Sequence, residues 1–124
     1  MFLGDISEPN TEHVSLMFKG VSEVRVRTGN CYDNVVVADV IVLTEILEHL
    51  EDPDRLLSLA REHGKYLVAS SPIDEVYKGN DEHVWGWTQQ QYKEMLEGSG
   101  WTPIAYQELK FFPKAYDFQL WICK

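Results

Sequence analysis

The sequence lacks several features that would assign it to familiar protein classes. No apolar run approaches the roughly 20 residues that a membrane-spanning helix needs, and Met1–Asp5 has neither the basic start nor the long apolar middle of a signal peptide. Its two cysteines, Cys31 and Cys123, form no CxxC pair, so no thiolate zinc site is encoded. We therefore expect a soluble, cytoplasmic protein with reduced cysteines, the alternative being one disulfide.

Basic residues are also scarce, with 11 Lys and Arg against 20 Asp and Glu and a net charge of −9. An acidic surface repels phosphate backbones and anionic lipid, so we expect neither nucleic acid nor a membrane as a partner. Hydrophobic residues make up 44% of the 124 residues, with six Tyr, five Phe and four Trp. That supply is enough for one packed core, and we expect a single domain over residues 1–124.

Hydrophobic periodicity and capping residues predict strands that alternate with helices. Val35–Leu43 is apolar on both faces, which is typical of a buried central strand. The expected elements are strand 2–7 ending at Asp5, helix 9–19, strand 21–27, strand 35–43, a helix begun by Asp52 and Pro53, strand 65–69, a long loop 73–87, a helix begun by Thr88 with Gln91, and strands 102–109 and 116–123 joined at Pro113–Lys114. This order predicts an α/β fold with a mainly parallel sheet and a C-terminal antiparallel hairpin.

The segment Thr44–Pro53 is the strongest candidate for chemistry. It follows an apolar strand, and α/β enzymes place their reactive groups at the carboxyl ends of such strands. Glu45, Glu48 and His49 stand at positions i, i+3 and i+4, which share one face if the segment turns helically. Such a face can hold a metal ion or polarise a hydroxyl group.

Motifs in three segments, taken in order, resemble the class I S-adenosylmethionine-dependent methyltransferases. Asp39–Pro53 is similar to that family's fourth strand and its EHL-x-DP turn, and Tyr66–Pro72 to its fifth strand with an S-x-P end. His83–Thr88 and Leu96–Trp101 resemble the H-x-x-x-W/F-T and LL-x-x-x-GF tail. The resemblance implies a Rossmann-like sheet, S-adenosylmethionine as cofactor, and methyl transfer to a small hydroxylated acceptor.

The same resemblance implies cofactor-binding residues near the N-terminus. Gly4–Ser7 is similar to the family's second strand, whose acidic end, here Asp5, holds the ribose hydroxyls, and Asn30 would end the third strand near the adenine. The alternative for Asp5 is a local Asx turn before Pro9. The alternative for Asn30 is a turn residue without a ligand role, because turns favour Asn. The family's first strand and its G-x-G-x-G loop are expected ahead of Met1 and do not occur, which implies an N-terminally truncated fold.

A missing central strand leaves buried backbone groups without partners, at about 1–3 kcal/mol each. The chain would then close the gap, exchange strands in a homo-oligomer, or pair with a partner chain that completes the sheet; a gene boundary is a further explanation. The alternative function is therefore a catalytically inactive, truncated methyltransferase-fold module that oligomerises or binds a partner.

Some relatives, among them small-RNA 2′-O-methyltransferases and ubiquinone-pathway O-methyltransferases, carry a Glu-x-x-Glu-His set and a later histidine. The resemblance implies a divalent metal site at Glu45, Glu48, His49 and His83, with Mg, Mn, Fe, Co and Zn all compatible. The alternatives are solvated glutamates and histidines without a ligand role, or a metal-binding protein without a methyl donor. Trp85 and Trp87 are expected either to form an aromatic wall of a substrate site or to anchor their loop to the core.

Overall fold

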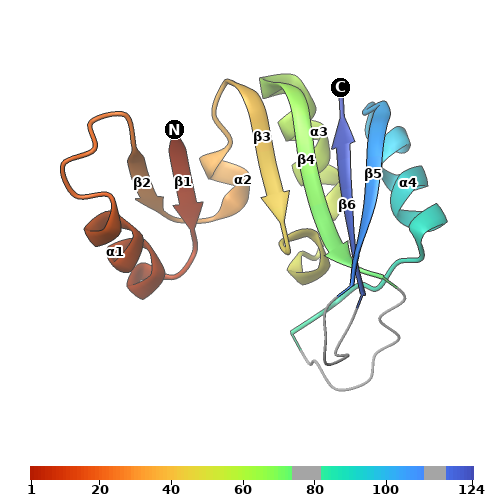
Figure 1. Ribbon diagram of the computed structural model, residues 1–124, viewed down its shortest axis with the longest axis horizontal. Coiled ribbons are helices and arrows are strands. Elements are labelled where there is room, and N and C mark those ends of the chain that lie inside the picture. Colours follow the sequence, from red (N-terminus) through yellow and green to blue (C-terminus); the bar gives the residue numbers. More distant parts are fainter. Residues whose placement is uncertain (74–81, 111–116) are drawn as a thin grey trace. The chain divides into compact units, whose positions relative to one another are not determined.

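The computed structural model describes residues 1–73, 82–110 and 117–124. The chain forms two compact units, Met1–Val36 and Val37–Lys124 (Figure 1). Among the described residues, no helix is both long enough and apolar enough to cross a membrane.

The first unit is a β-α-β arrangement followed by one helical turn. Strands β1 (Phe2–Asp5) and β2 (Arg25–Thr28) are parallel, with Asp5 opposite Thr28, and helix α1 (Glu8–Met17) connects them. Ser7 caps α1 by accepting a hydrogen bond from the backbone N–H of Asn10 at 3.4 Å. The buried Thr11 hydroxyl lies 2.5 Å from that of Thr28, which fastens the helix to the end of β2.

The second unit contains a four-stranded sheet in the order β3-β4-β6-β5. Its strands are β3 (Ala38–Thr44), β4 (Gly64–Pro72), β5 (Pro103–Lys110) and β6 (Asp117–Cys123). β3 and β4 are parallel, whereas β6 is antiparallel to both of its neighbours. The predicted α/β fold and its terminal hairpin are thus confirmed, while the predicted turn at Pro113–Lys114 lies outside the described residues.

Helices α3 (Pro53–His63) and α4 (Gln89–Gly98) pack on one face of this sheet (Figure 1). Both begin as their sequences predict: Asp52 accepts from the N–H of Arg55 at 3.0 Å, and Thr88 forms a capping box with Gln91. No loop separates α3 from β4, because Gly64 ends the helix and starts the strand. A Cβ atom at Gly64 would lie 2.9 Å from the Ile41 side chain.

The core lies between these helices and the sheet. Trp101 is 1% exposed, and its indole N–H donates to the carbonyl of Leu57 in α3 at 3.1 Å. The other fully buried apolar side chains of the second unit come from the 3-10 turn η1 (Leu47–His49) and from α3, β4, α4 and β6: Leu47, Leu56, Leu57, Ala60, Leu67, Ala69, Tyr92, Leu96 and Cys123.

The opposite face of the sheet is apolar and exposed. Cross-strand register places Val40 beside Tyr66, and Val42 and Ile122 on either side of Val68. Val40, Val42 and Tyr66 keep 48%, 57% and 44% of their surface exposed. The prediction of a buried central strand was therefore wrong in this unit, because β3 is the edge of the four-stranded sheet and the described helices of the unit cover only one of its faces.

Other differences from expectation are local. The strand expected over 21–27 begins only at Arg25 and ends at Thr28, and the short helix α2 (Cys31–Asn34) was not predicted. The expected loop 73–87 falls partly outside the described residues. Both cysteines are free thiols, as the sequence favours.

Candidate functional site

The candidate site begins where β3 ends. Glu45 follows the strand with a φ of +53°, in the left-handed region that few residues other than glycine adopt. The chain then forms a single 3-10 turn, η1 (Leu47–His49). Glu45 lies before this turn, so the expected helical face joining it to Glu48 and His49 does not form; the strained residue redirects the chain first.

Hydrogen bonds attach the segment 82–87 to η1. The backbone carbonyl of Glu48 accepts from the N–H groups of Val84 at 2.8 Å and Trp85 at 3.2 Å. The Trp85 indole N–H donates to the carbonyl of Leu50 at 2.8 Å, and Nδ1 of His49 lies 3.0 Å from the carbonyl oxygen of Glu82. These bonds fix two segments that lie more than thirty residues apart in the sequence.

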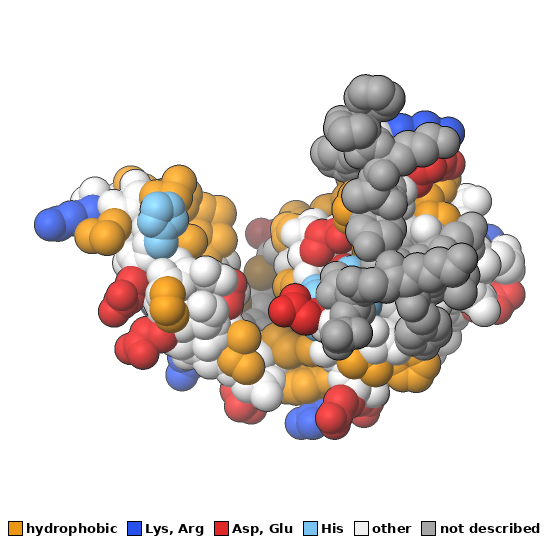
Figure 2. All heavy atoms as spheres, turned by 90° about the horizontal axis from the view of Figure 1, so that it is seen from below, with side chains coloured by type: hydrophobic (Ala, Val, Ile, Leu, Met, Phe, Trp, Pro, Cys, Tyr) orange, Lys and Arg blue, Asp and Glu red, His pale blue; other side chains and the backbone are white. Residues whose placement is uncertain are grey.

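The attachment brings together Glu48, His49 and His83. One potential ligand atom from each lies within 4.8 Å of the others, and the two imidazole rings meet edge to face with centroids 4.6 Å apart. Glu48 is fully buried, His83 is half-buried and His49 is exposed. Figure 2, which looks onto the carboxyl ends of β3 and β4, shows histidine surface between acidic side chains. One carboxylate and two imidazoles suit first-row divalent ions.

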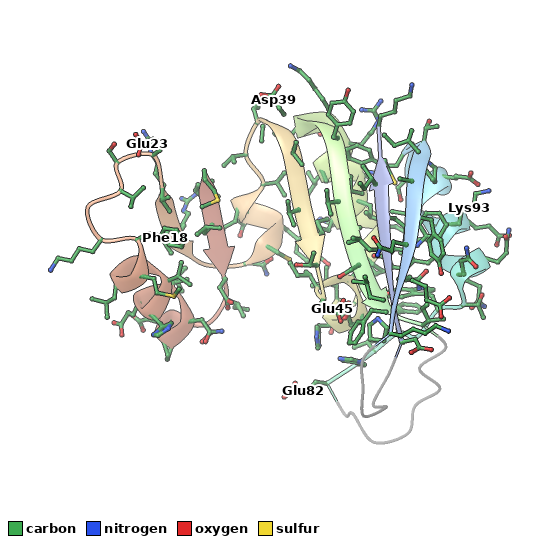
Figure 3. All side chains as sticks on the ribbon, viewed as in Figure 1. Phe18, Glu23, Asp39, Glu45, Glu82 and Lys93 are labelled. Atoms are coloured by element: carbon green, nitrogen blue, oxygen red, sulfur yellow. The ribbon has the colours of Figure 1, made fainter. Side chains whose placement is uncertain are left out.

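Glu45 is not a member of that group of three. Its Oε1 instead accepts a 2.6 Å hydrogen bond from the Ser70 hydroxyl at the end of β4, and its backbone N–H donates to the Ser70 carbonyl at 3.3 Å. Figure 3 shows Glu45 at the same end of the sheet as Glu82.

Tyr92 of α4 forms the buried floor beside these carboxylates. Its hydroxyl donates to the Ser70 carbonyl at 3.3 Å. Burial raises the pKa of Tyr92 well above its usual value, and the negative charges of Glu48 and Glu45 raise it further. The phenol therefore stays protonated at neutral pH. Sequence reasoning missed Ser70 and Tyr92; the carboxyl end of β4 was the only available signal for Ser70.

Three aromatic rings extend from this floor toward the surface. The Trp87 ring meets Tyr92 at 70° with centroids 5.4 Å apart, and stacks on Trp85 at 10° with centroids 6.1 Å apart. Tyr92, Trp87 and Trp85 are 0%, 8% and 40% exposed. The indole bond to Leu50 shows that Trp85 anchors its loop, one of its two expected roles.

In the first unit, Asp5 and Asn30 lie at the carboxyl ends of the parallel strands. Asp5 accepts from the Ser7 N–H at 2.7 Å and from the Asn10 side chain at 3.2 Å, the local turn given above as its alternative role. Asn30 caps α2 by accepting from the Tyr32 N–H at 3.0 Å. Each carboxylate oxygen has a second lone pair, so these bonds do not use up the acceptor capacity of Asp5.

No family model and no curated protein matches the sequence. Its structure resembles magnesium protoporphyrin IX methyltransferase from Synechocystis PCC 6803 (TM-score 0.80, 11% identity, 98% of this chain and 62% of that one). It also resembles 1,6-didemethyltoxoflavin-N1-methyltransferase from Burkholderia thailandensis (TM-score 0.82, 13% identity, 98% of this chain and 59% of that one). A third similar structure is the N-methyltransferase NodS from Bradyrhizobium japonicum WM9 (TM-score 0.81, 17% identity, 98% of this chain and 71% of that one).

The chain thus spans about three fifths of the length of the first two of these structures. At such low identities the likeness establishes the fold and nothing finer. The chain has the fold of the class I S-adenosylmethionine-dependent methyltransferases.

Proposed function

We propose that the protein is an S-adenosylmethionine-dependent methyltransferase, and that a divalent metal assists methyl transfer to a hydroxyl of a small acceptor. The observation that carries the metal site is the convergence of Glu48, His49 and His83 at the carboxyl edge of the sheet. Convergence of donors at this edge is how α/β folds build sites.

In this proposal His49, His83 and Glu48 bind the metal, because their nitrogen and oxygen donors form a suitable mixed set. A bound divalent ion lowers the pKa of a coordinated hydroxyl and so favours its attack on an activated methyl group. Glu45 is the fourth proposed ligand, as the family resemblance implies, because it follows the same strand end, although it lies outside the group of three. Ser70 holds the Glu45 carboxylate in place through its hydroxyl. The buried, protonated Tyr92 forms the inner wall of the site.

Titration calorimetry with Mn²⁺ tests the metal site. The wild type is compared with His83→Ala and with a matched control, His13→Ala, which changes an exposed histidine on α1. We expect His83→Ala to weaken Mn²⁺ binding at least about tenfold, since even mutation of a residue that only hydrogen-bonds to a metal ligand lowers metal affinity by that much. Equal affinity in wild type and His83→Ala excludes this ligand set.

For the cofactor, we propose that Asp5 receives the ribose hydroxyls and Asn30 lies near the adenine. Two of the similar structures are described with bound S-adenosylhomocysteine, which supports a cofactor of this kind. Asp5 ends β1, which the resemblance equates with the family's second strand. A carboxylate in that position can accept hydrogen bonds from both hydroxyls of a diol. The absence of a G-x-G-x-G loop makes direct measurement of binding essential.

Calorimetry with S-adenosylhomocysteine provides that measurement. Asp5→Ala is compared with Glu8→Ala, a change of another exposed acid in the first turn of α1. We expect the first change to weaken binding about tenfold or more, because it removes charge-assisted hydrogen bonds, and the second to leave binding unchanged. Folded wild-type protein that gives no heat with the cofactor would exclude the methyltransferase proposal.

The second candidate function is an inactive interaction module, which the exposed apolar sheet face favours. Val40, Val42 and Tyr66 lie together on that face, and β3 is the edge of its sheet. Open edges and apolar faces favour pairing with another chain, either a second copy or a partner. Light scattering of the wild type, Val42→Lys and the exposed control Leu16→Lys tests this function. A dimer that only Val42→Lys dissociates supports it, and a dilute wild-type monomer counts against self-association.

A further inference from the structure

The outermost ring of the aromatic series is exposed and held in a fixed position. Trp85 has 40% of its surface exposed, while one side of its indole stacks on the buried Trp87. Its indole N–H is bound to the Leu50 carbonyl, and its backbone N–H to the Glu48 carbonyl. Loop anchoring requires these two hydrogen bonds, but it does not require a large aromatic surface left open to solvent.

The position of this ring relative to the candidate metal ligands is set by the same hydrogen bonds. Trp85 follows His83 by two residues, and its N–H shares the carbonyl of Glu48 with Val84. The backbone of one candidate ligand therefore holds the loop that carries both a second ligand and the indole. The exposed indole is thus fixed to the same turn that carries Glu48 and His49, two residues along the chain from His83.

We infer that Trp85 is a stacking platform for a planar aromatic ring, and that the acceptor of this site is a small aromatic molecule carrying a hydroxyl group. Stacked rings attract one another beyond the effect of the area they bury, because the negative face of one ring meets the positive edge of the other. The net charge of −9 favours neutral or cationic rings over phosphate-bearing ones, which disfavours a nucleobase within a nucleic acid. The inference deepens the proposed function, on which the role of the hydroxyl rests, whereas the stacking itself does not depend on methyl transfer.

Catechol is a suitable probe, and cis-cyclohexane-1,2-diol is its matched control, because it offers two neighbouring hydroxyls without an aromatic ring. Binding to the protein in Mn²⁺ is followed by saturation-transfer NMR and calorimetry. We expect the wild type to bind catechol at least about fivefold more tightly than the diol, and Trp85→Ala to remove most of that preference. Tyr66→Ala, which removes another exposed aromatic ring, is the matched control and should change nothing.

Trp85→Phe separates stacking from loop anchoring, because phenylalanine keeps an aromatic ring but loses the N–H that binds Leu50. Recovery of catechol binding in this variant supports stacking. Loss of binding equal to that of Trp85→Ala assigns the residue to loop anchoring alone and overturns the inference, as does equal binding of catechol and the diol by the wild type. Binding of a short single-stranded RNA that depends on Trp85, without catechol binding, would also overturn it.

The metal and cofactor titrations are run on the same variants, so that failures remain distinguishable. Trp85→Ala with unchanged Mn²⁺ and S-adenosylhomocysteine affinities but weakened catechol binding affects only the platform. If His83→Ala leaves Mn²⁺ binding unchanged while catechol still requires Trp85, the metal proposal fails and the stacking site stands.

Discussion

The left-handed backbone at Glu45 leads to a sharp prediction about stability. Its φ of +53° suits glycine, whereas every residue with a Cβ is strained there. The prediction compares two substitutions, Glu45→Gly and Glu45→Ala. Both remove the carboxylate and its 2.6 Å hydrogen bond from Ser70, so the loss of that bond cancels in the comparison.

The difference between the two variants isolates the backbone. The left-handed conformation costs an L-residue roughly 1–2 kcal/mol, and Glu45→Ala keeps that cost while Glu45→Gly removes it. Glycine also gives the unfolded chain more freedom, which opposes the gain by about 0.4–1 kcal/mol. We therefore expect Glu45→Gly to be more stable than Glu45→Ala by about 0.5–1 kcal/mol.

Urea unfolding followed by circular dichroism measures this difference, with equal m-values required for a valid comparison. Glu45→Gln is the control, because it keeps the strain and an acceptor for Ser70 while removing the charge. If Glu45→Ala proves as stable as Glu45→Gly, the left-handed turn does not exist in solution and the redirected chain before η1 is wrong. If Glu45→Gly is more stable than the wild type itself, the strain is retained for a reason other than stability, which favours a role for the carboxylate.

Two further predictions concern the core of the second unit. Trp101→Phe loses the indole hydrogen bond to Leu57 and is expected to lower the free energy of unfolding, measured in urea, by about 1–3 kcal/mol. Trp85→Phe, which changes a partly exposed indole, is expected to have a smaller effect. Equal effects of the two substitutions would contradict this reasoning from burial. Burial raises the pKa of Cys123 to about 11, so this thiol stays protonated at pH 8 and its reactive thiolate is scarce. Iodoacetamide is expected to alkylate the half-buried Cys31 first and Cys123 only after unfolding, and mass spectrometry showing equal labelling would refute this.

Local chemistry explains which parts of the fold could be predicted from sequence. Asp52 with Pro53, and Thr88 with Gln91, satisfy helix N-termini within four residues, so no distant part of the chain is needed to recognise them. The exposure of Val42 could not be predicted in the same way. An apolar run permits burial on both faces, but the covering depends on helices elsewhere, and here one face stays exposed.

The candidate site divides along the same line. Glu48 and His49 are neighbours in sequence, so their proximity follows from the motif alone, while His83 was proposed only through the family resemblance. Its approach depends on backbone bonds to the carbonyl of Glu48, which carry no side-chain signature. The same limit explains why Ser70 was missed: its bond to Glu45 follows from strand register, with Thr44 opposite Ser70 in the β3–β4 pair.

Glu48 joins the metal proposal to the stacking proposal through two different groups. Its side chain is a candidate ligand, whereas its backbone carbonyl holds Val84 and Trp85. A substitution changes the side chain and keeps the backbone carbonyl. Glu48→Gln does so with almost no change of volume at a fully buried position. Weakened Mn²⁺ binding with retained stacking of catechol on Trp85 is therefore the expected pattern. Simultaneous loss of both would mean that the buried carboxylate, and not the backbone, holds the loop in place.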